Sequence, residues 1–255
     1  MAKAKGNSIM PPEFNGVLYT CGLRGVGKST LLSQVERPDL TCYLDFDDGK
    51  GRGLDEQLHF GLYRDVMAEM TVKYGRVYKP QQMYEYLDLL LKEVEQDKFT
   101  HCILDNIDYI EQALTVEVKR DPDAYGITRN KSGVSNAVTG AFGGPYPGVN
   151  QLVSGLINTF HAKGIRVVSA IAHVKSVWGS GGIVPNKWKP RGVERWQQMS
   201  ILSLVVIPGT PDPLPPAALV QKEALGKVKF NNDSGEFEKP IRRLPLRLAR
   251  RSLRG

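Results

Sequence analysis

The sequence predicts an α/β protein with a mostly parallel β-sheet and helices on both of its faces. Five short runs are nearly continuously apolar, which is typical of parallel strands that helices cover on both sides. Segments with a helical pattern lie between these runs, and this alternation indicates a doubly wound sheet. The expected strands span residues 17–21, 41–46, 101–104, 166–171 and 201–207.

The expected helices and loops follow from the same patterns. Segment 218–248 is predicted to form a C-terminal β-hairpin that turns at 231–235. Two long stretches rich in helix breakers, 121–148 and 175–191, interrupt the pattern, and connections of this length are usually functional or disordered. The expected helices span residues 28–35, 54–67, 81–96 and 148–163.

Length, composition and charge narrow the class of protein. The 255 residues suit one domain, and 41% hydrophobic with 24% charged residues excludes a fibrous or wholly disordered chain. No apolar run approaches the roughly 20 residues of a membrane span, and the N-terminus lacks the apolar segment of a signal peptide. We therefore expect a cytoplasmic protein without membrane contact. The net charge of +7 includes a basic stretch at 239–254, which is either a binding tail or a solvated terminus.

The three cysteines give no sign of metal binding or disulfide formation. Cys21, Cys42 and Cys102 lie in or beside strand-like runs and lack C-x-x-C spacing. We expect them to be small buried hydrophobic residues.

A glycine-rich stretch between the first strand and the first helix carries the clearest chemistry. Residues 22–29 read GLRGVGKS and match the Walker A pattern G-x-x-x-x-G-K-[ST]. In this pattern, backbone N–H groups surround the β-phosphate of a nucleotide, the lysine reaches the β- and γ-phosphates, and the serine hydroxyl ligates Mg²⁺. The expected nucleotide-binding residues are Gly22, Gly25, Val26, Gly27, Lys28, Ser29 and Thr30.

A second motif supports the first. The run HCILDN at 101–106 is an apolar strand that ends in the carboxylate of Asp105. This is the Walker B arrangement, in which the aspartate helps to hold Mg²⁺, so Ser29 and Asp105 are the expected magnesium residues. The alternative is a buried strand that ends in a capping aspartate. The two motifs together predict a P-loop nucleoside triphosphatase.

Side chains at two further strand ends are candidates for the hydrolytic step. Asp47, in the run YLDFDDG at 43–49, would face the γ-phosphate and polarise the attacking water, although Asp-Asp-Gly is also an ordinary turn sequence. Asp48 begins a GTPase-like D-x-x-G, but no N-K-x-D motif for guanine follows, so ATP is favoured. His173 ends the fourth strand and is either a γ-phosphate sensor or structural. The expected catalytic residues are Lys28, Asp47, Asp105 and His173.

In this order, the motifs resemble the RecA superfamily. A P-loop, a Y-L-D-x-D strand end, a Walker B strand and a strand that closes in a polar residue follow one another as they do there. The Ala-His ending of the fourth strand and the closing segment 224–245 resemble the small phage-type RecA-like recombinase-core ATPases. A phage-encoded chain would act in the cytoplasm of its host. Asp47 stands where RecA-like proteins place a catalytic glutamate, with Asp48 as the alternative.

The resemblance extends over about residues 16–245 and implies a domain organisation. A RecA-like ATPase domain is expected at 16–238. A flexible N-terminal segment at 1–15 precedes it, and a basic tail at 239–255 follows it.

The resemblance also implies where DNA and neighbouring subunits bind. In RecA-like proteins, two loops after the Walker B and sensor strands bind single-stranded DNA, and these correspond to 121–148 and 175–191. The second loop mixes cationic and aromatic residues, which suits phosphate contact and base stacking, or else it is a tryptophan-anchored surface loop. The family completes its site with basic residues of a neighbouring subunit, for which Lys222 and then Lys227 are the candidates. The expected DNA-binding residues are Lys175, Trp178, Lys187, Trp188, Lys189 and Arg191.

These features predict an oligomeric RecA-like ATPase that uses ATP and Mg²⁺. It would form a ring or filament, bind single-stranded DNA and act in recombination or strand annealing. The first alternative is a small-molecule or nucleotide kinase with an arginine-bearing lid at 120–129. The second is an ATP-switched motor or adaptor subunit that binds a protein partner through its basic tail.

Overall fold

The computed structural model describes most of the chain between residues 16 and 207 and several short strands beyond it. The predicted N-terminal segment 1–15 and most of the basic tail lie outside the described residues. None of the described helices combines the length and the apolar character that a membrane span requires. The described residues are 16–33, 35, 37–47, 51–75, 79–140, 143–179, 182–190, 195–207, 217–222, 230–231, 236–237 and 243–245.

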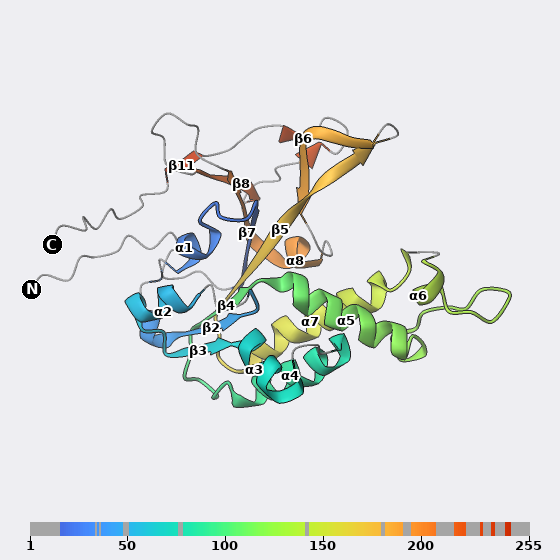
Figure 1. Ribbon diagram of the computed structural model, residues 1–255, viewed down its shortest axis with the longest axis horizontal. Coiled ribbons are helices and arrows are strands. Elements are labelled where there is room, and N and C mark those ends of the chain that lie inside the picture. The colour runs from blue at the N-terminus through green and yellow to red at the C-terminus, as the bar shows by residue number, and fades with distance from the viewer. Residues whose placement is uncertain are drawn as a thin grey trace, which may run out of the picture.

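In the described part of the chain, the fold is built on a nine-stranded sheet in which six consecutive strands are parallel (Figure 1). Across the sheet, the parallel strands follow the order β7-β1-β5-β4-β2-β3. The strand that enters the P-loop, β1, therefore lies between β7 and β5, and β5 separates it from the Walker B strand β4. These strands are β1 (Gly16–Gly22), β2 (Thr41–Asp45), β3 (Leu62–Asp65), β4 (His101–Asp105), β5 (Val167–Gly179) and β7 (Ser200–Ile207).

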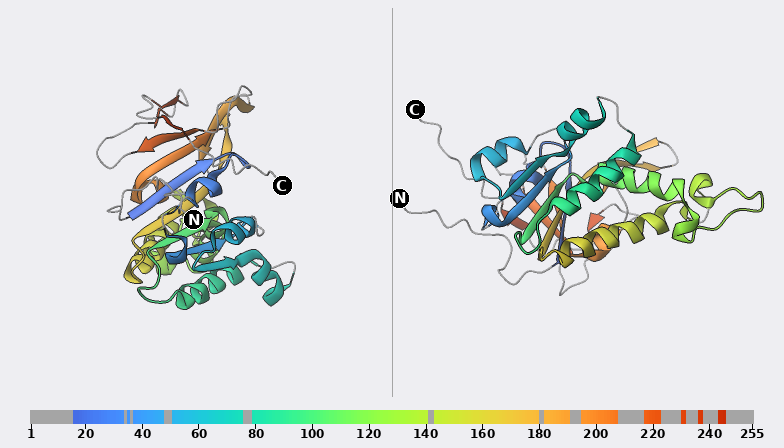
Figure 2. Two further views of the ribbon diagram at one scale, coloured as in Figure 1. Left: turned by 90° about the vertical axis from the view of Figure 1, so that its left-hand side faces the viewer. Right: turned by 90° about the horizontal axis from the view of Figure 1, so that it is seen from below.

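Helices cover both faces of the sheet, as Figures 1 and 2 show. Alternate residues of each strand point to opposite faces, so Tyr19 and Leu44 join a large core cluster while Leu18 and Tyr43 join a smaller one. The large cluster packs under α3 (Val66–Tyr74), α4 (Pro80–Glu93), α5 (Ile107–Arg120), α7 (Tyr146–Ala162) and α8 (Arg195–Met199). The smaller cluster packs under α1 (Lys28–Leu32) and α2 (Arg52–Leu58).

This arrangement confirms the predicted α/β class, a mostly parallel sheet with helices on both of its faces. The five predicted strands all form, within a few residues of the expected ends except for β5. The three cysteines are free and fully buried, in agreement with the expectation that they are small hydrophobic residues.

The helix predicted over 54–67 was wrong in its second half. The chain leaves α2 and forms β3, which pairs in parallel with β2 at the edge of the six parallel strands, before α3 begins at Val66. The four residues of β3 are all partly buried, so neither an alternating nor a continuously apolar pattern marked them as a strand. Helix α5 was not predicted either, although Asn106 caps its N-terminus by accepting a hydrogen bond from the backbone of Asp108.

The predicted loop at 175–191 is instead largely a β-hairpin. Strand β5 continues past the sheet to Gly179, and β6 (Gly182–Pro190) returns antiparallel to it. Figure 1 shows this hairpin extending away from the helices that cover the sheet. The reason is that β5 runs on beyond its parallel neighbours, and β6 supplies the hydrogen-bond partners that they no longer offer.

The C-terminal part is antiparallel, in line with the predicted hairpin. Strand β8 (Ala217–Lys222) pairs with β7 on one side and with β11 (Arg243–Pro245) on the other. In the sequence between β8 and β11, β9 (Phe230–Asn231) pairs antiparallel with β10 (Glu236–Phe237), on either side of the predicted turn.

The long insert at 121–148 contains two short helical turns. They are η2 (Asp123–Tyr125) and α6 (Asn136–Thr139), and α6 lies beyond the far end of α5 in Figure 1. A further helical turn, η1 (Pro38–Leu40), precedes β2.

Candidate nucleotide-binding site

The P-loop runs from the end of β1 into α1 and presents an open backbone. Gly25 and Gly27 have φ angles of 74° and 88°, a region that favours glycine. A Cβ atom at either position would meet no heavy atom within 4 Å, so the space beside these glycines is open. Lys28 is buried, and its Nζ donates to the carbonyl oxygens of Gly22 at 3.2 Å and Leu23 at 2.7 Å. The open loop and the buried cation suit a phosphate group.

Lys28 is electrostatically suited to an anionic ligand. Burial lowers the pKa of its ammonium group, while the nearby carboxylates of Asp105 and Asp47 oppose this effect. A phosphate at the same place would favour the charged form further. Among the other predicted nucleotide-binding residues, Val26 packs into the smaller core cluster, and Ser29 and Thr30 lie in the first turn of α1.

Asp105, at the end of β4, meets the first turn of α1. Its Oδ2 atom accepts a short hydrogen bond from the Ser29 hydroxyl and another, at 2.7 Å, from the hydroxyl of Tyr43. Burial raises the pKa of Asp105, and these two hydrogen bonds counteract it. The structure thus brings the two predicted magnesium residues into direct contact.

The residues present at this point fit Mg²⁺. This ion takes oxygen ligands and is commonly bound by one or two protein groups together with phosphate oxygens and waters. The hydroxyl of Ser29 and the carboxylate of Asp105 are such a pair beside the P-loop. Across the described ranges, no group of three or more His, Cys, Asp or Glu side chains could hold a metal ion.

Asp47 lies just past β2 and faces the P-loop. Its side chain is 9% exposed, and its Oδ1 atom forms an ion pair of 3.4 Å with the Arg24 guanidinium, which is 69% exposed. The backbone N–H of Asp47 donates to Oδ1 of Asp45 at 2.8 Å. Asp48, the alternative candidate for activating water, lies outside the described residues.

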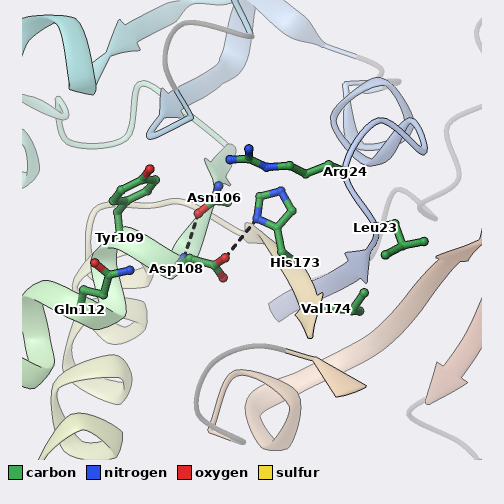
Figure 3. Close-up of a pocket in the computed structure, with 8 residues that line it drawn as sticks. All are labelled: Leu23, Arg24, Asn106, Asp108, Tyr109, Gln112, His173 and Val174. Carbon is green, nitrogen blue, oxygen red and sulfur yellow. Dashed lines mark hydrogen bonds and ion pairs between the residues drawn. The ribbon is translucent and has the colours of Figure 1, made fainter. Parts of the chain in front are cut away.

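His173 borders a pocket next to the P-loop (Figure 3). Its Nδ1 atom lies 3.1 Å from Oδ2 of Asp108 in the first turn of α5. The side chain of Arg24 extends from the P-loop toward Asn106 at the start of that helix (Figure 3). The pocket has a volume of about 510 Å³ and is lined by Leu23, Arg24, Asn106, Asp108, Tyr109, Gln112, His173 and Val174.

Strand register explains why these side chains meet. Gly22 is in register with His173 of the neighbouring strand, and Asp45 is in register with Asp105. Because parallel strands end at the same edge of a sheet, the residues that end them share one surface, where ligands of α/β sheets commonly bind. All four predicted catalytic residues, Lys28, Asp47, Asp105 and His173, lie at this edge.

Four polar residues of this edge received no role from the sequence. Tyr43 and Asp45 lie in the run 43–49, from which the sequence predicted a hydrolytic role for Asp47 and its alternative Asp48 alone. Arg24 stands at a variable position of the Walker A pattern. Asp108 was missed because it belongs to the unpredicted helix α5, although Asn106 and Asp108 directly after the Walker B strand were a visible capping signal.

The structure describes only part of the predicted DNA-binding set. Lys175 of β5 lies directly opposite Lys189 of β6, and both side chains are exposed. Trp178, Lys187 and Trp188 lie in the strands of the same hairpin, and Arg191 falls outside the described residues. Two like charges opposite each other are unfavourable in an antiparallel pair, so an anion near them would stabilise the hairpin.

The remaining predicted positions lie away from this edge or outside the structure. Lys222 ends β8, where it is in register with Ser203 of β7, and Lys227 lies outside the described residues. Arg120 bonds to Glu117 at the last turn of α5, about 20 Å along that helix from Asp105. Arg129 is also paired, with Asp123 in η2.

Comparisons with known proteins find similarity to solved structures. No protein-family model matches the sequence, and no curated protein matches it. Among solved structures, a similar chain is described as the "Crystal structure of the RadB recombinase". The sequence identity is 16%, the match covers 83% of this chain and 84% of the other, and the TM-score is 0.43.

Proposed function

We propose that this chain is an ATPase that binds single-stranded DNA and acts as a homo-oligomer in recombination or strand annealing. The observation that carries the ATPase assignment is the meeting of P-loop and strand-end residues at one edge of the sheet. There the P-loop lysine, the Ser29–Asp105 pair and the Asp47 carboxylate surround one open backbone loop.

Each of these groups has a task in hydrolysis. The ammonium group of Lys28 would offset the charge of the β- and γ-phosphates, and the backbone around Gly25 and Gly27 would donate hydrogen bonds to them. Ser29 and Asp105 would hold Mg²⁺, which neutralises developing phosphate charge when it is bound. Their present hydrogen bond keeps both oxygen atoms at one point.

Asp47 is our candidate for activating water. A water that attacks the γ-phosphorus gives one proton to the Asp47 carboxylate as the new P–O bond forms, and the bond to the β,γ-bridging oxygen breaks. The ion pair with Arg24 holds the Asp47 carboxylate beside the P-loop, where it would accept that proton. His173, held by Asp108, would stand beside the γ-phosphate as its sensor.

The DNA assignment is supported by the hairpin. Lys175 and Lys189 place two exposed cations side by side, and aromatic residues occupy neighbouring strand positions. Cations with interleaved aromatic residues suit a single-stranded backbone with stacked bases. Strand β5 carries both His173 and Lys175, so a change at the γ-phosphate would reach the hairpin through one continuous strand.

ATP turnover with and without DNA tests this proposal. We expect a low basal rate that rises when single-stranded DNA is added, and rings or filaments in negative-stain images with DNA and a non-hydrolysable ATP analogue. An ATP turnover rate that does not change when DNA is added, together with particles of a single subunit, contradicts the proposal. A protein partner that survives nuclease treatment in a pull-down would favour the ATP-switched adaptor instead.

A kinase is the second candidate, and the pocket favours it. A space of about 510 Å³ next to the P-loop, with an Asp108–His173 pair at its wall, could receive an acceptor hydroxyl. Against a kinase, Arg120 and Arg129 of the predicted lid bond to their own neighbours at the far end of α5. ATP consumption that depends on a nucleoside or another small acceptor, and not on DNA, would favour this candidate.

A further inference from the structure

Asp45 is a deeply buried carboxylate that has no part in the hydrolytic scheme above. It ends β2 with 0% exposure and accepts three hydrogen bonds. Its Oδ1 accepts from the backbone N–H of Asp47 at 2.8 Å, and its Oδ2 accepts from the backbone N–H of Gly51 at 2.6 Å and from the Tyr63 hydroxyl at 2.9 Å.

The three hydrogen bonds compensate for the burial of this charge. Burial raises the pKa of Asp45, and the donors at Asp47, Gly51 and Tyr63 counteract it. A buried carboxylate is strongly unfavourable without such partners. Through these bonds, Asp45 holds the backbone N–H groups of Asp47 and Gly51 at the end of β2.

The packing around Asp45 is built for this geometry. A Cβ atom at Gly51 would lie 2.7 Å from Cε1 of Tyr43 and 3.0 Å from Oδ2 of Asp45, so the close approach of this backbone needs glycine. Tyr63 reaches Asp45 because β3 pairs in register with β2, with Tyr43 opposite Tyr63. The strand that sequence patterns missed therefore supplies one of the three donors.

We propose that Asp45 is the positioning residue for Asp47, and that Tyr63 supports it in this role. Asp45 acts through the backbone of residue 47. Its Oδ1 accepts from the Asp47 N–H and so fixes the main-chain position from which the Asp47 side chain extends. A displacement of an activating group by about 1 Å can lower turnover by about 100-fold, while the residues that bind the nucleotide keep their places. The proposal rests on the proposed ATPase function.

A double-mutant cycle on ATP turnover tests this role. Asp45→Asn keeps the size of the side chain, but its single carbonyl oxygen replaces two acceptors and its NH₂ group faces a donor. We expect kcat to fall by about 10- to 100-fold, as for the loss of a group that orients a functional ligand, with KM within about twofold of wild type. In an Asp47→Asn background, the same substitution should change kcat by less than about twofold, because residues that act as a unit are not additive.

Tyr63→Phe provides a milder variant of the same test. It removes the hydroxyl donor to Asp45 and leaves the two backbone donors, of Asp47 and Gly51, in place. We expect a smaller loss of kcat that also vanishes in the Asp47→Asn background. Tyr86→Phe is its matched control, since the Tyr86 hydroxyl also donates to a carboxylate, that of Glu69, away from the P-loop. Tyr86→Phe should leave kcat unchanged.

The outcomes separate this inference from the proposed function. The positioning role is wrong if the kcat losses of Asp45→Asn and Tyr63→Phe multiply with that of Asp47→Asn in the double variants. It is also wrong if the two substitutions raise KM and leave kcat unchanged. In either case the ATPase assignment stands. If Asp45→Asn does not fold by circular dichroism, the Tyr63→Phe cycle decides. If the wild-type chain does not hydrolyse ATP, or Asp47→Asn matches wild type, the proposed role of Asp47 fails and this inference fails with it.

Discussion

The two ends of strand β4 differ in how their polar side chains are held. At the carboxyl end, Asp105 accepts hydrogen bonds from Ser29 and Tyr43 and faces the open P-loop. At the amino end, His101 is buried and has Ser169 of β5 at 2.7 Å as its hydrogen-bond partner. Burial lowers the pKa of His101 to about 3, so this end is neutral at ordinary pH.

Under the proposed function, this difference places ATP hydrolysis at one end of β4 and a purely structural contact at the other. The carboxyl end gathers charged groups from several elements beside open space, which a ligand needs. The amino end holds one neutral imidazole inside packed residues, where a charge would be unfavourable. We therefore expect substitutions at the first end to change turnover, and substitutions at the second to change folding alone.

Lys28→Ala should have the largest effect on turnover. The buried ammonium group of Lys28 lies within the P-loop, bonded to the carbonyl oxygens of Gly22 and Leu23, so the rate should fall by at least about two orders of magnitude and nucleotide affinity should drop. Steady-state phosphate release and nucleotide titration measure both. Lys92→Ala, at an exposed lysine of α4 paired with Asp88, is the control and should change neither. A Lys28→Ala rate equal to wild type would show the P-loop assignment to be wrong.

Asp47→Asn should follow, with about a 10²- to 10⁴-fold loss of turnover and unchanged nucleotide binding. The physical reason is that asparagine cannot accept the proton of the attacking water. Asp48→Asn, measured in the same assay, should have a much smaller effect, because only one carboxylate can lie in line with the γ-phosphate. If Asp48→Asn alone abolishes turnover, the water-activating residue lies one position further along the chain.

Asp105→Asn should lower turnover by about 10- to 100-fold and raise the Mg²⁺ concentration that turnover requires. The neutral amide still accepts one hydrogen bond from Ser29 or Tyr43 but holds a cation less well. Magnesium titrations of the rate, together with nucleotide binding in EDTA, measure this split. Equal losses of binding and turnover would indicate a structural role and would weaken the contrast between the two ends of β4.

The β5–β6 hairpin, which extends the carboxyl edge, should affect DNA binding and its salt dependence. Replacing Lys175 and Lys189 by Ala should reduce the slope of affinity against salt for single-stranded DNA by about 0.7 per lost contact. Trp188→Ala should lower affinity by roughly 1 to 3 kcal/mol with the slope almost unchanged, if a base stacks there. Truncation before Lys239 is the control, and loss of all affinity in that variant would move the binding site to the tail.

His101 should have the smallest functional effect and a measurable effect on acid stability. Its pKa is about 3 in the folded chain and about 6.5 when unfolded, so the unfolded state binds the proton first. The stabilisation is fully present above about pH 6.5 and is lost as the pH falls toward 3, by about 2 kcal/mol at pH 5. His101→Gln should flatten this dependence in urea unfolding at pH 7 and pH 5, with turnover at pH 7 unchanged. If His101→Gln lost turnover without a change in stability, the two ends of β4 would not differ in role as we expect.

Local patterns in the sequence were sufficient to predict the glycine-rich turn after β1 and the five main strands, including the Walker B strand. Gly22 to Ser29 form one short segment, and its spacing alone specifies the turn and the cation that a phosphate needs. The apolar runs of β1, β2, β4 and β7 are continuous because both of their faces are covered, and this is visible without the fold.

Only the tertiary structure decided what pairs with these residues. Strand β3 has no periodic pattern of apolar residues, because it is a partly buried strand at the edge of the parallel strands. The hairpin at 175–190 forms because β5 extends beyond its parallel neighbours. Tyr63, Arg24 and Asp108 lie 18 to 65 residues along the chain from the groups that they contact, and Asp45 contacts Asp47 within one turn, so no local pattern predicted these contacts. A sequence determines which residues can form a turn or a strand, because that depends on near neighbours; which charged side chains meet depends on strand order and register, which the whole packed sheet sets.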